Sequence, residues 1–303
     1  MIRKRMTVWY GEMASRKQLA LRGSAILSPS ILWLLLLLVL PGLVLIAVSF
    51  TERGAYGEIE WFFSLDNYKR LMGFGMLGWS ADILSIIARS VWVAFVTTLI
   101  SVLLSYPISF FIVSRPQRQR ILWLTVLIVP FWTNMVIRAY AWFLLLAPDM
   151  PLTKLAVFIG VHPPNTPLYP SSFAVYLGMV SMFLPFVALP LYSSVERLDW
   201  SLVEAAQDLY ATRVRVFMQA ILPQTIPGLT AGVILTFVPA MGMFVVPNLL
   251  GGSKFMLVGN LIQQQFGASR DWPFGAAISM GLMVLTMISL QIYRKKGKGV
   301  EPI

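Results

Sequence analysis

Six long blocks of apolar residues are the feature that most restricts what this 303-residue chain can fold into. A helix needs about 20 mostly apolar residues to cross the hydrocarbon core of a bilayer. The blocks reach that length, whereas the strands of a membrane barrel alternate over only about ten residues. They cover residues 31–50, 86–113, 121–147, 172–193, 226–250 and 274–293. The sequence therefore predicts an all-α integral membrane protein with six transmembrane helices.

The composition excludes an ordinary water-soluble domain. Hydrophobic residues make up 57% of the chain and charged residues 12%, against about 45–50% and about 25% in soluble domains. The first block follows basic residues, as the core of a signal peptide would. Its apolar run is long and lacks a small-x-small cleavage site, so we predict an uncleaved first span.

The placement of positive charge predicts the topology. The net charge is +11, and 16 of the 24 Lys and Arg residues lie before the first block, between the second and third, between the fourth and fifth, or after the sixth. Cytoplasmic loops of membrane proteins collect Lys and Arg. Both termini are therefore expected in the cytoplasm, and the basicity does not indicate nucleic-acid binding.

The predicted organisation is a single membrane domain with short ends. Residues 1–30 form a basic cytoplasmic segment that either lies along the inner membrane surface or is a disordered tail. Residues 31–293 form the transmembrane domain, and residues 294–303 form a cytoplasmic tail. In the outer loop of residues 51–85, residues 64–71 predict a short amphipathic helix. Prolines inside the spans either line a cavity or are common membrane kinks.

Several classes of chemistry are excluded by what the sequence lacks. Without cysteine, neither a disulfide nor a thiolate metal site can form. No G-x-x-x-x-G-K-[ST] motif is present to hold ATP phosphates. All 13 acidic residues lie outside the six blocks, which argues against a carrier driven by protons or sodium. A membrane enzyme would need a catalytic cluster, and no block holds His, Asp or Glu; a membrane scaffold is a further alternative.

The inner segment of residues 195–224 is much longer than the other inner loop. Ser201 and Glu204 match a capping box, and Ala205, Ala206 and Leu209 predict an apolar stripe on the helix that follows. A second helical stretch is expected over residues 212–222, ended by Pro223. Two short amphipathic helices at this place would form a knob that docks into a groove on a partner.

This segment also resembles the EAA signature of ABC importer permeases. The matching residues are Glu204, Ala205, Ala206, Asp208, Leu209, Phe217, Leu222, Pro223, Pro227, Gly228, Ala231 and Gly232. The resemblance implies a coupling helix that inserts into the ATPase subunit, with contacts from Glu204, Ala205, Ala206, Asp208, Leu209, Tyr210 and Ala211. For Glu204 the alternative is that it only caps its helix.

Two positions depart from the family pattern. Tyr210 stands where the family has Gly, and Ala220 where it has Ile. Glycine makes a turn with positive φ easy, whereas Tyr pays a steric cost there.

The later part of the chain resembles the spermidine/putrescine permeases, specifically their first permease subunit, with the type I (MetI-like) fold. The motifs are at residues 239–242, 248–252, 259–262 and 270–277. The resemblance implies a non-catalytic subunit in a bacterial cytoplasmic membrane that works by alternating access. Its implied partners are a pair of ABC ATPase subunits that bind ATP and Mg, a second related permease, an external polyamine-binding protein and membrane lipid. Ferric iron, thiamine, sulfate or a phosphonate are alternative cargoes.

A polyamine is a flexible polycation, so its path favours aromatic faces and carboxylates. The candidate pathway residues are Trp132, Asn134, Tyr140, Trp142, Asp149 and Asp271. The aromatic residues could instead be interfacial anchors, and the two aspartates could be loop residues or helix caps. Arg138 would repel a cation, so we expect it to pair with a helix-end carbonyl or a partner's acid, or to reach the interface.

Overall fold

The protein is described by a computed structural model, which covers residues 27–75, 78–252 and 255–297. Most of the predicted basic segment and the end of the predicted tail lie outside these residues. In the described part, five helices are long and apolar enough to cross a membrane, and there are six if one bent pair counts as a span. Three of the five are single elements: α4 (Asp82–Val113), α8 (Ser172–Glu196) and α13 (Trp272–Gly297). The other two are Leu27–Ser49, which ends in α2 (Leu40–Ser49), and Arg213–Met241, which ends in α11 (Leu222–Met241). The bent pair is α5 (Gln117–Trp132) and α6 (Met135–Leu145). The all-α membrane architecture is confirmed.

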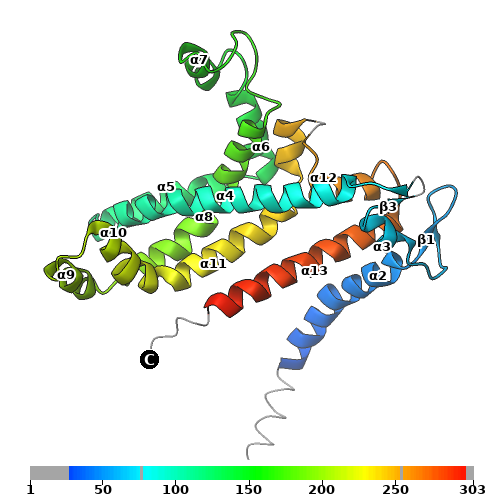
Figure 1. The fold of residues 1–303 in the computed structure, drawn as a ribbon, viewed down its shortest axis with the longest axis horizontal. Coiled ribbons are helices and arrows are strands. Elements are labelled where there is room, and N and C mark those ends of the chain that lie inside the picture. Colours follow the sequence, from blue (N-terminus) through cyan, green and yellow to red (C-terminus); the bar gives the residue numbers. More distant parts are fainter. Residues whose placement is uncertain (1–26, 76–77, 253–254, 298–303) are drawn as a thin grey trace, which may run out of the picture.

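The centre of the molecule is the packed group of α4, α8 and α11 (Figure 1). Buried Thr97, Ser101, Ser105 and Ser109 follow one another at four-residue spacing along α4, so they occupy one helix face. Small residues at helix interfaces let backbones in a membrane approach closely. These serines and threonines therefore form the surface on which α4 meets its neighbours.

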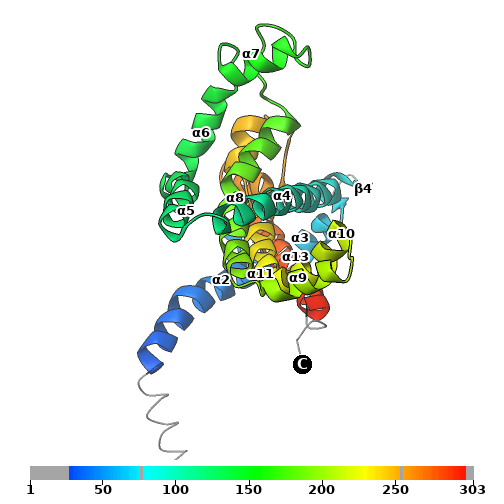
Figure 2. The ribbon, with the colours of Figure 1, turned by 90° about the vertical axis from the view of Figure 1, so that its left-hand side faces the viewer.

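Two parts of the chain leave this centre in different directions. One is the arm formed by α6 and α7 (Pro151–Phe158), and the other is α2, which packs against α13 near its end (Figure 2). In the most apolar window of Leu27–Ser49, only 6% of the residues are buried. Both parts expose apolar surface.

The third apolar block was predicted to be one span, but the structure has two helices there, bent by 95° relative to each other. Thr133 and Asn134 have extended backbone, with ψ of 149° and 140°, which interrupts the helical hydrogen bonds after α5. The Asn134 Oδ1 then accepts a hydrogen bond of 2.7 Å from the Val136 amide and begins α6. A local cap thus breaks a segment whose composition is apolar throughout.

The fifth block also differs from its prediction. Its helix begins at Arg213 and ends at Met241, and a π turn, η3 (Pro247–Gly251), follows within the predicted span. Asn260, on α12 (Val258–Phe266), donates hydrogen bonds to the Phe244 carbonyl at 3.0 Å and to Asn248 Oδ1 at 2.9 Å. These bonds tie α12 to the segment that follows the break.

Small elements gather at one end of the long helices, which we call the hairpin end (Figure 1). They are the antiparallel pair β1 (Glu52–Arg53) and β2 (Ile59–Glu60), helix α3 (Asp66–Leu71), and the antiparallel pair β3 (Phe74–Gly75) and β4 (Gly78–Trp79). The predicted short helix is confirmed as α3. The opposite end carries α9 (Trp200–Asp208) and α10 (Arg213–Val216), and we call it the α9 end.

Candidate functional site

Helix α9 begins with a cap on Asp199. The Asp199 carboxylate accepts hydrogen bonds from the Ser201 amide at 3.0 Å and from the Ser201 hydroxyl at 2.7 Å. The predicted capping box was wrong, because Ser201 lies inside the first turn and Asp199 supplies the acceptor. Glu204 is exposed, and its side chain forms no hydrogen bond or ion pair with any described residue. The alternative in which Glu204 caps the helix is therefore wrong as well.

One side of α9 is anchored and the other is free. Val203 is buried with Val216 and Ala220, and Ala206 and Ala211 pack against this cluster. The predicted stripe is wrong at Ala205, which is exposed, and at Leu209, which is 82% exposed. The other predicted contact residues, Glu204, Asp208 and Tyr210, are likewise exposed. Whether these residues contact an ATPase stays a prediction.

The turn that follows α9 has the backbone conformation expected from the family pattern. Tyr210 has a φ of +56°, in the left-handed region that favours glycine. The Tyr210 amide donates to the Gln207 carbonyl at 2.9 Å, and the Ala211 amide donates to the Ala206 carbonyl at 3.1 Å. The side chain of Tyr210 is 95% exposed, so nothing in the described chain crowds it.

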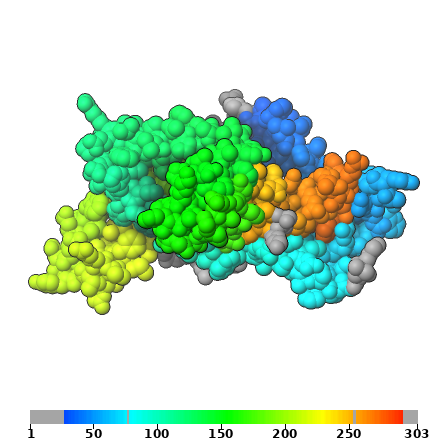
Figure 3. Space-filling model, turned by 90° about the horizontal axis from the view of Figure 1, so that it is seen from above, coloured from blue at the N-terminus to red at the C-terminus, as the bar shows by residue number. Residues whose placement is uncertain are grey.

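The second inner helix is the beginning of the fifth long helix. Pro223 was predicted to end it, but α10 continues through the π turn η2 (Phe217–Ile221) into α11 without a break. Pro223 follows the π turn η2 almost directly, where the hydrogen-bond ladder of the helix is already shifted, so its missing N–H does not end the helix. The knob formed by α9 and α10 therefore stands directly on a membrane helix, and it projects at one end of the molecule (Figure 3).

The candidate pathway residues at the α5–α6 break lie close to two hollows. The α5 cleft, about 880 Å³, lies between α5 and α6 on one side and α4 and α8 on the other; it is lined by Pro107, Ile108, Phe111, Ile112, Trp123, Val126, Leu127, Pro130, Arg138, Ala141, Trp142, Leu145, Ser181, Leu184 and Pro185. The break pocket, about 470 Å³, is lined by Phe131, Thr133, Met135, Arg138, Met182, Phe183, Phe186, Pro239, Gly242, Met243 and Phe244. The break pocket joins the interruption in the third span to the one after α11.

Only some of the predicted pathway side chains face these hollows. Trp142 lines the α5 cleft, Trp132 and Tyr140 are exposed, and Asn134 caps α6. Arg138 lines both hollows, and its guanidinium carbon lies 5.3 Å from the centre of the Phe131 ring. Its Nε atom is buried and has no hydrogen-bond partner in the described chain. Of the four candidates near the break, only Trp142 lines a hollow, and whether any of them contacts a substrate stays a prediction.

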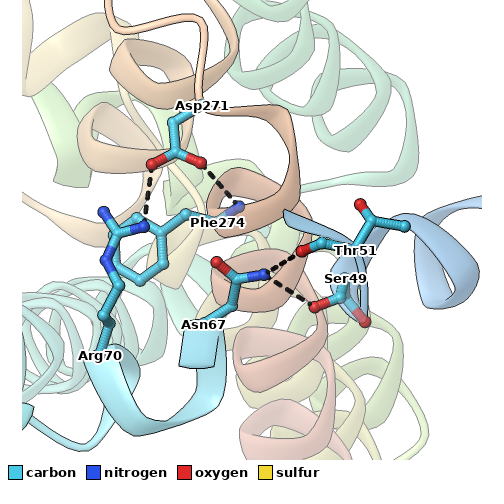
Figure 4. A network of polar contacts seen from close by, with 6 residues as sticks. All are labelled: Ser49, Thr51, Asn67, Arg70, Asp271 and Phe274. Carbon is cyan, nitrogen blue, oxygen red and sulfur yellow. Dashed lines mark hydrogen bonds and ion pairs between the residues drawn. The ribbon is translucent and has the colours of Figure 1, made fainter. Parts of the chain in front are cut away.

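The two candidate aspartates have different surroundings. Asp149 is exposed in the turn before α7. Asp271 is 3% exposed; it accepts a hydrogen bond from the Arg70 guanidinium at 3.0 Å and one from the Phe274 amide at 3.2 Å (Figure 4). Both carboxylate oxygens are therefore engaged in holding α13 to α3.

Asn67 and Arg70 are polar residues at the hairpin end whose roles the sequence did not reveal. Buried Asn67 donates to the carbonyls of Ser49 at 3.2 Å and Thr51 at 2.8 Å, while Arg70 also lies 3.9 Å over the Phe274 ring (Figure 4). Through these contacts α3 joins the ends of α2 and α13. The only signal in the sequence was their place on one short helix.

No group of three or more His, Asp or Glu side chains that could hold a metal ion occurs in the described part of the chain. His162 interacts with the Thr166 hydroxyl at 2.9 Å and the Pro167 carbonyl at 3.2 Å.

Comparison with known proteins defines the class. Residues 122–295 match the family described as binding-protein-dependent transport system inner membrane component, and the chain belongs to this family. It is thus a multi-pass inner-membrane permease subunit of an ABC importer, and not an enzyme.

Individual proteins similar to this chain are permeases with more specific names. The chain is 40% identical over 261 residues to the spermidine/putrescine transport system permease protein PotB of Escherichia coli (strain K12), covering 86% of this chain and 92% of the relative. It is 37% identical over 268 residues to PotB of Haemophilus influenzae, covering 88% and 91% of the two chains. The inner membrane ABC transporter permease protein YdcU of E. coli K12 is 30% identical over 224 residues, covering 70% and 71%.

Solved structures confirm the fold. A chain of a bacterial ABC transporter involved in the import of the acidic polysaccharide alginate matches with a TM-score of 0.68 at 16% identity, covering 95% of this chain and all of that one. A chain of a bacterial alginate ABC transporter in complex with an alginate pentasaccharide-bound periplasmic protein matches with a TM-score of 0.65 at 16% identity, covering 92% and 93% of the two chains. The predicted type I permease fold is therefore confirmed.

Proposed function

We propose that this chain is the permease subunit of an ATP-driven importer that moves spermidine or putrescine across the cytoplasmic membrane by alternating access. The identity of 37–40% to spermidine/putrescine permeases, over 86–88% of this chain, carries the proposal. The α9 end faces the cytoplasm together with both termini, and the hairpin end faces outward. The excess of Lys and Arg in the segments assigned to the inside supports this orientation.

The proposed partners follow from this orientation. Helix α9 docks into one of two ABC ATPase subunits, which bind ATP and Mg, while this chain holds no cofactor. Exposed Leu209 and Tyr210 at the end of α9 supply apolar contact area for that docking. A second related permease completes the membrane part, lipid surrounds it, and an external polyamine-binding protein delivers substrate at the hairpin end.

The proposed path of the polyamine runs beside the α5–α6 break. Discontinuous helices commonly form the substrate sites of membrane transporters. Trp132, Tyr140 and Trp142 offer ring faces for ammonium groups near this break. Exposed Asp149 attracts cations at the outer mouth. Asp271 acts indirectly, because its carboxylate is committed to Arg70 and to the start of α13.

Transport by the complete complex tests the cargo. The chain is reconstituted in proteoliposomes with its ATPase, second permease and binding protein, and uptake of labelled spermidine and putrescine is measured. We expect ATP-dependent uptake that unlabelled polyamine inhibits and ferric ion does not. Accumulation of ferric ion in place of polyamine would contradict the proposal.

A substitution on the free face of α9 tests the docking. Leu209→Glu places a charge on an exposed apolar side chain without disturbing the buried Val203 cluster. We expect loss of the ATPase subunit on purification and loss of uptake, with unchanged membrane insertion. Val161→Glu is the matched control, because Val161 is 79% exposed and lies outside the α9 knob. Equal retention of the ATPase by both variants would remove α9 from the interface.

A further inference from the structure

An ion pair joins α5 to the end of α8 next to the α9 knob. Glu196, the last residue of α8, accepts a hydrogen bond from the Arg120 guanidinium at 3.2 Å and one from the Tyr192 hydroxyl at 2.8 Å on the same oxygen, Oε1. The Arg120 Nε also donates to the Arg115 carbonyl at 2.8 Å. The guanidinium is thereby fixed to the turn between α4 and α5 and to the carboxylate of α8. We call Arg120, Tyr192 and Glu196 the α5–α8 junction.

The segment between the α5–α8 junction and α9 is short and held on both sides. Arg197 caps the end of α8, and Asp199 caps the start of α9. Between them, Leu198 is 6% exposed in a core with Leu191 and Val195. The Asp199 amide donates to Gln224 Oε1 at 2.9 Å, which ties the segment to α11. A displacement of α9 must therefore move the Glu196 carboxylate with it.

Helix α5, on the other side of the junction, is loosely packed. None of its residues is buried, and the α5 cleft separates it from α4 and α8. Ring contacts hold it near its two ends, between Trp123 and Phe111 at 5.1 Å and between Phe131 and Phe186 at 5.0 Å. An element with few buried contacts moves at low free-energy cost. Its position therefore depends on the tethers at its ends.

We infer that Arg120 and Glu196 are positioning residues that carry a displacement of α9 to α5, and through α5 to the break in the third span. This inference rests on the proposed function, since it assumes that an ATPase displaces α9. A charge-assisted hydrogen bond gives the link direction and geometry. The two side chains are 28% and 43% exposed, and such partly exposed pairs contribute little to folding stability. The role of the pair is therefore to set the position of α5.

Charge reversal in the complete complex tests the link. Arg120→Glu, Glu196→Arg and the double variant are reconstituted with the ATPase, the second permease and the binding protein, and imported polyamine is measured per ATP hydrolysed. We expect this ratio to fall about fivefold in each single variant, within the range found for residues that modulate coupling. The double variant restores the ratio, since the opposite charges again face each other and the Tyr192 hydroxyl can accept as well as donate.

Arg118→Glu is the matched control. Arg118 is exposed on the same turn of α5 and makes no hydrogen bond or ion pair within the described chain, so its reversal leaves the ratio unchanged. If a reversal prevents assembly, Glu196→Gln is measured instead and gives a smaller loss in the same direction. An unchanged ratio in the single variants, or a double variant no better than either, overturns the inference. Failure of the proposed function looks different, because the unaltered complex would then import no polyamine.

Discussion

At the residue scale, Asp271 carries one of the few buried charges at the hairpin end. Removing a carboxylate from water is costly unless a positive group and hydrogen-bond donors replace the solvent. Here the Arg70 guanidinium supplies the charge, and the Phe274 amide at the start of α13 supplies a donor. The ring of Phe274 lies under the same guanidinium. One carboxylate therefore fixes the start of α13 and the place of α3 together.

We expect Asp271→Ala to lower the free energy of unfolding by about 2 kcal/mol, because it removes a helix cap and leaves the buried donor unpaired. Asp271→Asn keeps an acceptor for the Phe274 amide and loses only the charge, so about 1 kcal/mol is expected. Thermal unfolding of the purified protein in detergent measures both. Asp66→Asn is the control, since its pair with Lys69 is exposed and should give no measurable change. Loss of uptake by Asp271→Asn at unchanged stability would instead indicate a substrate contact.

Two residues at the opposite ends of α9 show how much of the candidate site could be predicted from the sequence. The positive φ of Tyr210 was predictable because the family pattern has glycine there, and glycine marks a left-handed turn. The Asp199 cap was not recognised, because Ser201 and Glu204 match the spacing of a capping box equally well. Local sequence offers competing acceptors, and the path of the chain leaving α8 decides which one is used.

At the element scale, α8 and α11 approach closely where glycines replace side chains. A Cβ atom at Gly232 would lie 2.9 Å from the Val187 Cα and 3.2 Å from its carbonyl oxygen. At Gly228 it would collide with the Pro190 carbonyl and the Ser194 hydroxyl. Backbone atoms cannot yield as a side-chain end can. Helix α11 therefore fits against α8 only with glycine at these positions.

We expect Gly232→Ala to lower the free energy of unfolding by about 1–3 kcal/mol, the usual cost of overpacking. Gly228→Ala is expected to cost at least as much, because the obstructing atoms are closer. Gly42→Ala on α2 is the control; no atom lies within 4 Å of its Cβ position, and alanine favours the helix. Thermal unfolding in detergent measures all three. A loss for Gly42→Ala equal to that for Gly232→Ala would show that packing against α8 is not the cause.

The bounds of the helices were predictable where apolar length alone decides them, as in α4 and α8. The break in the third span was not, because residues 121–147 are apolar on both sides of Thr133 and Asn134. The helix nevertheless ends there, and the Asn134 side chain caps the new helix α6 by accepting a hydrogen bond from the Val136 amide. The predicted end of α10 was also wrong, because this helix continues into α11. Pro223 suggested an end, yet the π turn η2 before it shifts the hydrogen bonds of the helix, and the helix continues.

At the scale of the whole molecule, the arrangement of the spans could not be derived from the sequence. Lipid tails are as apolar as leucine, so hydrophobicity alone does not distinguish a helix face directed at lipid from one directed at another helix. The arm of α6 and α7 and most of α2 leave the centre of the molecule (Figures 1 and 2), and both carry large apolar side chains that no other part of the described chain covers. The charges of the sequence do predict which end of the molecule lies inside.

The α9 end and the hairpin end should therefore lie on opposite sides of the membrane, and the absence of cysteine makes this testable. Ser201→Cys on α9 and Ala55→Cys on the β1–β2 turn each introduce a single thiol at an exposed position. Six arginines lie near the α9 end in the inner segments, so positive charge retains that end inside. We expect a membrane-impermeant maleimide to label Ala55→Cys in sealed spheroplasts, and to label Ser201→Cys only after the membrane is permeabilised. Labelling of Ser201→Cys in sealed spheroplasts would show that the topology is inverted and that α9 does not contact a cytoplasmic ATPase.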